Sequence, residues 1–76
     1  MKDLVKVIAV SLVDHPEEVV VTEKETDRSL ILELHVAPDD MGKVIGKQGR
    51  IARAMRTVVK AAASKEDKKV IVDIAQ

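Results

Sequence analysis

Hydrophobic residues near the start of the chain repeat at helical spacing. From Leu4 to Leu12, every fourth residue is leucine or isoleucine, so these side chains would share one face of a helix. The pattern predicts a helix over residues 2–14, which ends before Pro16 because the residue before a proline disfavours the helical conformation. The β-branched side chains of residues 5–10 also suit a strand, which remains an alternative for this segment.

The pattern then changes to that of strands. Residues 19–22 form a β-branched run, and residues 30–36 carry an aliphatic side chain at every second position. The polar run 25–29 between them predicts the turn of a hairpin. Residues 70–74, again rich in valine and isoleucine, predict a third strand.

Two helices are predicted between the second and third strands. The first starts at Pro38-Asp39-Asp40, with Asp39 as its predicted N-cap, and ends at Gly46. The second runs roughly from Arg50 to Ser64. Its predicted inward stripe consists of Ile51, Met55, Val58 and Ala62.

The two helices are joined by a pair of glycines, Gly46 and Gly49, which are separated by two residues. Glycine has no Cβ, so such a pair lets the chain turn sharply and brings backbone N–H groups close to an anion. Basic residues follow at three- and four-residue spacing, along one side of a helix whose positive end adjoins the turn. By itself, this glycine spacing also fits an ordinary connection between helices. The basic residues are Arg50, Arg53, Arg56 and Lys60.

The residues that flank the glycines carry a family resemblance. Val44-Ile45 precede the turn and Arg50-Ile51 follow it, which resembles the core signature of the KH domain, an RNA- and single-stranded-DNA-binding module. Between residues 37 and 59 the chain looks very like the short bacterial single-KH proteins of the KhpA family. This resemblance implies an α+β fold, the type II KH domain, over residues 1–76. Its order is α-β-β-α-α-β, with helices packed on a three-stranded mixed sheet.

Charge is segregated along the chain although the formal net charge is zero. Residues 1–40 carry four basic and ten acidic side chains, a balance of −6, while residues 41–76 carry the opposite balance of +6. Residues 42–63 contain six basic residues and no acidic one. A charge run is usually a solvated face. Here it coincides with the glycine turn, which favours a nucleic-acid footprint.

Composition argues against catalysis and against metal or cofactor binding. A length of 76 residues predicts one domain whose core is too small for a buried catalytic cavity. The chain has no cysteine, and His15 and His35 lack a clustered carboxylate in the sequence, so they form a poor metal or acid–base set. We therefore expect no enzyme, no metal, no cofactor and no small-molecule substrate.

The expected cellular location follows from the lengths of the apolar runs in the sequence. None is long enough to cross a bilayer, and the start of the chain lacks the features of a signal peptide. A cytoplasmic location without membrane contact is expected.

The predicted mechanism is a clamp on single-stranded RNA. The glycines admit the sugar-phosphate backbone, the amides of residues 47–50 donate to phosphate oxygens, and basic side chains add a salt-sensitive attraction. Ile45 would floor an apolar groove for unpaired bases together with Val44 and Ile51, although core packing is the favoured role for the latter two and remains open for Ile45. The predicted RNA-binding residues are Lys43, Val44, Ile45, Gly46, Lys47, Gln48, Gly49, Arg50, Ile51 and Arg53.

The chain contains no Phe, Tyr or Trp, so it forgoes stacking that contributes roughly 1–3 kcal/mol per base elsewhere. A single weak site favours pairing with a second one, because linked sites raise avidity. Ala52, Val59 and Ala63 form a second apolar line on the second KH helix, which predicts a homodimer interface, although burial in the core explains this line equally well.

The KhpA resemblance also implies a heterodimer with another KH-containing protein, as an alternative to the homodimer, and a link to envelope growth and cell shape. The predicted role is that of a post-transcriptional regulator or RNA chaperone. The alternative is a protein-interaction module with residual nucleic-acid binding.

Overall fold

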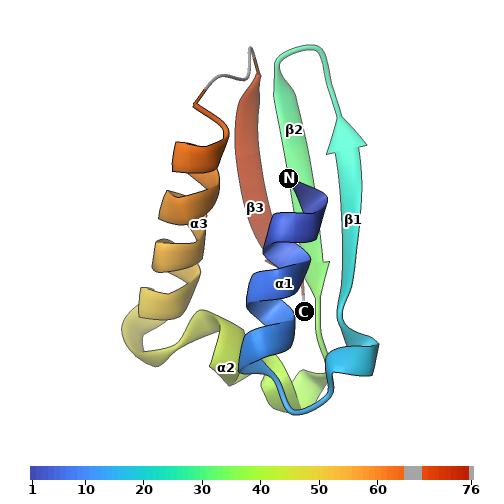
Figure 1. Cartoon of the computed structure of the whole chain (residues 1–76), viewed down its shortest axis with the longest axis vertical. Helices are drawn as coiled ribbons and strands as arrows, with labels where there is room; N and C mark the ends of the chain where they lie inside the picture. The colour runs from blue at the N-terminus through green and yellow to red at the C-terminus, as the bar shows by residue number, and fades with distance from the viewer. Residues whose placement is uncertain (65–67, 76) are drawn as a thin grey trace.

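The computed structural model describes residues 1–64 and 68–75, and it places the helices against one face of a three-stranded sheet (Figure 1). The predicted order α-β-β-α-α-β is confirmed. Three short 3-10 turns, η1 (Pro16–Glu18), η2 (Pro38–Asp40) and η3 (Lys47–Gly49), connect these elements. The elements are α1 (Lys2–Leu12), β1 (Val20–Glu25), β2 (Ser29–His35), α2 (Met41–Ile45), α3 (Arg50–Ala62) and β3 (Lys69–Ala75).

The sheet is mixed, as the resemblance implied. Strands β1 and β2 form an antiparallel hairpin in which Val21 pairs with Leu34, whereas β2 and β3 are parallel, with Leu32 opposite Val72. Parallel neighbours cannot be joined by a tight turn, so the chain between them must cross over the sheet. Helices α2 and α3 make this crossover, which puts the glycine turn at its midpoint.

The core lies between the sheet and the helices. Every second residue of β2 points toward the helices, and Leu32 and Leu34 are fully buried there. Helices α1 and α3 cover this face of the sheet, with Val5 of α1 and Met55 of α3 among the buried side chains. The complete buried cluster is Val5, Ala9, Val19, Val21, Leu32, Leu34, Val44, Met55, Val59 and Val72.

Helix α1 confirms the helical prediction for the N-terminal segment and removes the strand alternative. It ends at Leu12, two residues earlier than expected, because Val13 is already extended (φ −98°, ψ 160°). None of the described helices is long and apolar enough to cross a membrane.

The inward face of α3 differs from the predicted one. Met55 is buried as expected, but Val58 is 48 % exposed, Ala62 is exposed and Ile51 is only half-buried. The helix carries two adjacent apolar lines that both satisfy helical spacing. The sheet and α1 cover the line that includes Val59, so the predicted stripe is wrong apart from Met55.

The predicted dimer line is therefore part of the core. Ala52, Val59 and Ala63 are all buried within the single chain. Side chains that already pack inside one molecule offer no surface to a second copy, so these three residues cannot form the predicted interface.

Two adjacent valines test which face of α3 is buried in the core. Val59→Ala should lower the free energy of unfolding by about 2 kcal/mol, because it leaves a cavity in the core. Val58→Ala changes the same residue type in the same helix, and it should cost less than about 0.5 kcal/mol because the side chain is half exposed. Urea unfolding measures both. Equal losses of unfolding free energy, or a larger loss for Val58→Ala, would show that Val59 does not lie on the buried face of α3.

Candidate nucleic-acid interface

The predicted turn lies between α2 and α3, and its backbone needs glycine. Gly46 has φ 75° and ψ 174°, a combination that is essentially restricted to glycine. Gly49 has φ 74° and ψ 15°, and Gln48 before it also has a positive φ of 58°. These are left-handed conformations that glycine adopts without a steric penalty. Three positive φ angles within four residues reverse the chain between the two helices.

The two glycines are needed for different reasons. A Cβ built on Gly46 would lie 2.6 Å from Cγ1 of Ile51, so the Ile51 side chain occupies the space that any other residue would require. A Cβ on Gly49 would meet nothing within 4 Å. Gly46 is thus fixed by packing and by its backbone angles, whereas Gly49 is fixed by its angles alone and has open space in front of it. Ile51 supports the turn.

Two of the four amides predicted to bind phosphate are used within the turn. The N–H of Gly49 donates to the carbonyl of Gly46 at 3.1 Å, and the N–H of Arg50 donates to the carbonyl of Lys47. Lys47 and Gln48 stand at the start of η3, where backbone N–H groups have no partner inside the helix. These two amides are therefore the ones that can receive an anion.

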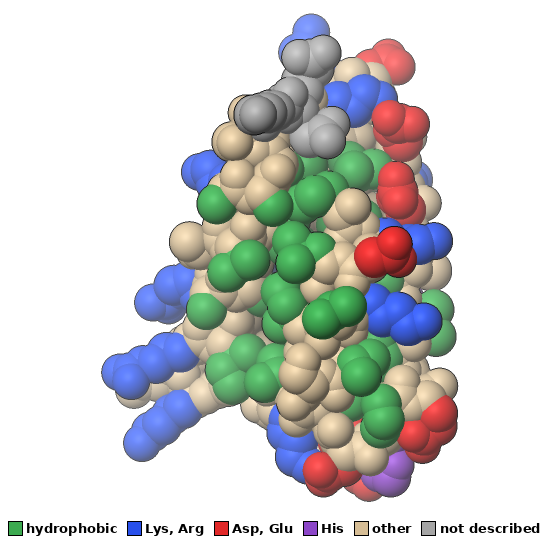
Figure 2. All heavy atoms as spheres, in the orientation of Figure 1, with side chains coloured by type: hydrophobic (Ala, Val, Ile, Leu, Met, Phe, Trp, Pro, Cys, Tyr) green, Lys and Arg blue, Asp and Glu red, His purple; other side chains and the backbone are tan. Residues whose placement is uncertain are grey.

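Basic side chains surround the turn. Lys47, Arg50 and Arg53 are exposed, and none has a carboxylate within ion-pair distance among residues 1–64 and 68–75. In Figure 2, Lys and Arg side chains project from the side formed by α3, while the opposite side along β1 carries Asp and Glu together with further Lys and Arg side chains. The α3 side is thus positive in this view, whereas the opposite side carries both signs.

Two other basic residues of this run are engaged elsewhere. Lys43 forms ion pairs with Asp14 and with Asp40, and the hydrogen bond that its ammonium donates to the Asp14 carboxylate raises the pKa of Lys43 above the ordinary value. Arg56 donates from Nε to the carbonyl of Val72 in β3 at 3.1 Å. Lys43 was predicted to attract RNA, but its charge is already compensated within the protein.

The apolar residues before the turn divide between core and surface. Val44 is completely buried, so the prediction that it contacts bases is wrong and its favoured core role is confirmed. Ile45 packs against the core with one side and is half-buried. With Val36, Pro38 and Met41 it lines a shallow pocket beside the turn. Only Ile45 of this pair is accessible to a ligand.

Asp40 has a role that the sequence did not reveal. Its carboxylate is fully buried and accepts hydrogen bonds from the backbone N–H groups of Asp14 (3.2 Å) and His15 (3.0 Å). Burial by itself would raise the pKa of Asp40, but these two bonds and the charge of Lys43 hold the pKa below its ordinary value. Asp40, and not the predicted Asp39, occupies the N-cap position of α2, and it makes no capping bond there.

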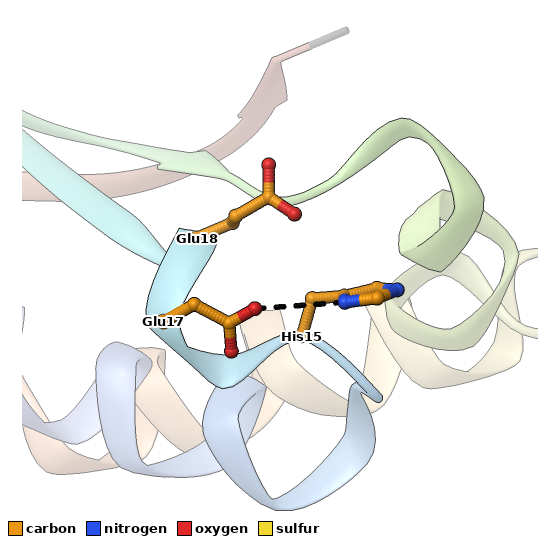
Figure 3. A group of neighbouring side chains, drawn as sticks. All are labelled: His15, Glu17 and Glu18. Carbon is orange, nitrogen blue, oxygen red and sulfur yellow. Dashed lines mark ion pairs between the residues drawn. The ribbon is translucent and has the colours of Figure 1, made fainter.

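One cluster with metal-ligating groups lies apart from the turn, at η1 (Figure 3). His15, Glu17 and Glu18 bring their ligand atoms within 4.8 Å of one another, and Nδ1 of His15 is 3.5 Å from Oε1 of Glu17. The expectation that no carboxylate clusters with a histidine is therefore wrong. All three residues are exposed, as ordinary surface charges are, and we assign no metal to them.

Comparisons with known proteins converge on one family. The family described as KhpA/KhpB, KH domain, matches residues 2–74. The chain is 69 % identical over 74 residues to the RNA-binding protein KhpA of Clostridium perfringens (strain 13 / Type A), covering 97 % of this chain and 99 % of that protein. It is 55 % identical over 76 residues to the RNA-binding protein KhpA of Listeria monocytogenes serovar 1/2a, covering all of both chains.

A solved structure supports the fold. The crystal structure of Aquifex aeolicus Era Y63A bound to GDP.AlF4- superposes with a TM-score of 0.61 and 17 % sequence identity. The match covers 96 % of this chain and 28 % of that one, so it concerns one part of the larger protein.

The two glycines yield a matched prediction. Gly46→Ala should lower the free energy of unfolding by about 3 kcal/mol, because the backbone angles and the Ile51 side chain both oppose a Cβ. Gly49→Ala should cost only about 1 kcal/mol, because it meets strain but no clash. Thermal or urea unfolding measures both variants. A Gly49 variant as unstable as the Gly46 variant would contradict the distinction.

Proposed function

The chain belongs to the KhpA/KhpB family of KH domains, and from this membership we propose that it binds single-stranded RNA at the turn between α2 and α3. The family is not a class of enzymes, in agreement with the expectation from composition. The observation that carries the proposal is the coincidence, at a glycine turn, of two amides without helical partners and three basic side chains that have no acidic partner among the described residues. An interaction module without an RNA ligand gives no reason for an exposed lysine inside that turn.

The proposed contact is with the sugar-phosphate backbone. The amides of Lys47 and Gln48 donate to phosphate oxygens, and the open space before Gly49 lets the strand approach the protein backbone closely. The N-terminus of α3, a helix of 13 residues, adds its partial positive charge at the same place. Lys47, Arg50 and Arg53 supply the full charges.

The bases contribute less in this proposal. The accessible apolar surface beside the turn is the shallow pocket at Ile45, which suits the face of an unpaired base. The chain has no aromatic residue on which a base could stack, so affinity is modest and sequence preference is loose. Such binding suits a protein that acts on many RNAs, as a post-transcriptional regulator or RNA chaperone.

We further propose that the binding unit is a dimer, with an interface different from the one that the sequence suggested. On the outer side of α3, Ala54 and Val58 are the exposed apolar residues nearest its centre, with Arg50, Arg53 and Thr57 around them. A two-fold pairing of α3 through Val58 brings two RNA sites into one particle. The same surface is the one we propose for a second KH-containing protein.

Reversing charge at the turn tests the RNA site. The double variant Lys47→Asp/Gln48→Asp should bind single-stranded RNA more than about tenfold more weakly than wild type, because two carboxylates would face the phosphates. The variant should remain folded, since both side chains are exposed. Fluorescence anisotropy with labelled RNA measures the Kd, and circular dichroism checks the fold.

A matched control separates local contact from overall charge. Lys6→Asp/Ser11→Asp makes the same change in net charge at two exposed positions of α1. It should weaken binding by less than about threefold, since distant charges are screened at physiological salt. Unchanged RNA affinity in the folded turn variant would remove the turn from the binding site.

The dimer is tested at Val58. Val58→Glu should give a folded monomer with weaker RNA binding, whereas Val7→Glu should leave the oligomeric state unchanged, although Val7 is the more exposed residue at 65 %. Light scattering of all three proteins at about 50 µM decides between monomer and dimer. A wild-type protein that is monomeric under these conditions would refute the homodimer.

A further inference from the structure

Asp40 is the one fully buried charged residue in the described part of the chain. Each of its oxygens has a separate donor: Oδ1 accepts from the N–H of Asp14 and Oδ2 from the N–H of His15. Nζ of Lys43 lies 3.5 Å from Oδ1. Burying a carboxylate is costly unless it is paired and hydrogen-bonded, and here two backbone hydrogen bonds and the ammonium of Lys43 offset that cost.

The partners of Asp40 are remote in sequence. Asp14 and His15 belong to the segment between α1 and η1, 26 and 25 residues away along the chain. An aspartate at a helix N-cap normally accepts a hydrogen bond from its own helix, but Asp40 makes no such bond to α2. The carboxylate therefore does not cap α2. It stabilises the contact between the start of α2 and the segment between α1 and η1.

Helix α2 depends on such a contact. It has only five residues, too few to be stable by its own hydrogen bonds. Its beginning is held by Asp40 and its last turn by buried Val44, and its C-cap is Gly46, where the glycine turn starts. Lys43 strengthens the first attachment by pairing with Asp14 as well as with Asp40. The position of the turn relative to the rest of the fold is thus set through α2.

We propose that Asp40 is a positioning residue for RNA binding, which docks the N-terminus of α2 on the segment between α1 and η1 and thereby fixes the glycine turn. This inference rests on the proposed RNA site at that turn. Asp40 itself is buried and touches no ligand. Its effect on RNA is transmitted through the short helix, by holding the amides of Lys47 and Gln48 in place before RNA arrives.

Asp40→Asn is the sharpest probe. Asparagine keeps the size of the side chain, but its NH₂ group faces a backbone N–H where Asp40 has an acceptor oxygen. The substitution also removes the negative charge that attracts Lys43. One hydrogen bond is lost and one donor is left opposite another donor. The matched control is Val21→Ala, a core substitution in β1, which lowers stability at the far edge of the sheet from α3.

The first measurement is independent of RNA. The amides of Gly46 and Gly49 donate to the carbonyls of Gly42 and Gly46, so their hydrogen exchange reports the order of the turn. In Asp40→Asn, at a temperature where circular dichroism shows the variant fully folded, both amides should exchange about tenfold faster than in wild type. Val21→Ala should not change them selectively. Equal exchange in Asp40→Asn and wild type would overturn the inference.

The second measurement is the Kd for single-stranded RNA under the same conditions. Asp40→Asn should weaken binding about tenfold, while Val21→Ala should leave the affinity of the folded protein unchanged. If Asp40 only stabilised the fold, both variants would melt at a lower temperature than wild type, and both would keep the wild-type Kd. Equal Kd values for the two variants would therefore overturn the inference.

Two further outcomes are separable. If wild-type protein binds no RNA, the proposed function is refuted, and the exchange of Gly46 and Gly49 alone decides whether Asp40 fixes the turn. If Asp40→Asn does not fold, Lys43→Gln replaces it, because it removes the facing charge and leaves both backbone hydrogen bonds to Asp40. Faster exchange of the Gly46 amide in that variant supports the inference, and unchanged exchange overturns it.

Discussion

The turn at Gly46 sets the path of the chain from β2 to β3. Because these strands are parallel, the connection must cross the helical face of the sheet, and it must bury Val44 before the turn and Ala52 after it. Both can be buried only if the chain reverses within a few residues, which the positive φ angles at Gly46 and Gly49 allow. The same reversal places the amides of Lys47 and Gln48 at the start of η3, where N–H groups have no partner inside the helix, so one constraint serves the fold and the proposed RNA site.

The basic run from Lys43 to Lys60 divides its charges between structure and ligand. Lys43 compensates Asp14 and the buried Asp40, and Arg56 satisfies a carbonyl of β3, whereas Lys47, Arg50 and Arg53 have no acidic partner in the described residues. The division follows from position. Lys43 finds acceptors in Asp14 after α1 and in Asp40, and Arg56 finds one in β3, whereas the basic side chains beside the turn have none among the described acidic residues. A count of charges in the sequence therefore overestimates the positive charge available to RNA.

Local patterns predicted what depends on local physics. The order of helices and strands followed from periodicity, and the turn followed from Gly46 and Gly49, whose requirement for positive φ is a property of each residue. Contacts between distant segments were not predictable in this way. The bonds from Asp14 and His15 to Asp40 and the ion pair of Lys43 with Asp14 depend on the folded path. The choice between Val58 and Val59 as core residue depended on what covers α3.

Contacts with phosphates, and not stacking of bases, should provide most of the affinity for RNA, because the chain has no aromatic residue. The most direct test is the salt dependence of the Kd for one single-stranded RNA, measured beside a duplex of the same sequence. Three basic residues at the turn predict a slope of about −2 for log affinity against log salt concentration, with tighter binding of the single strand. A flat salt dependence, or a preference for the duplex, would contradict the account.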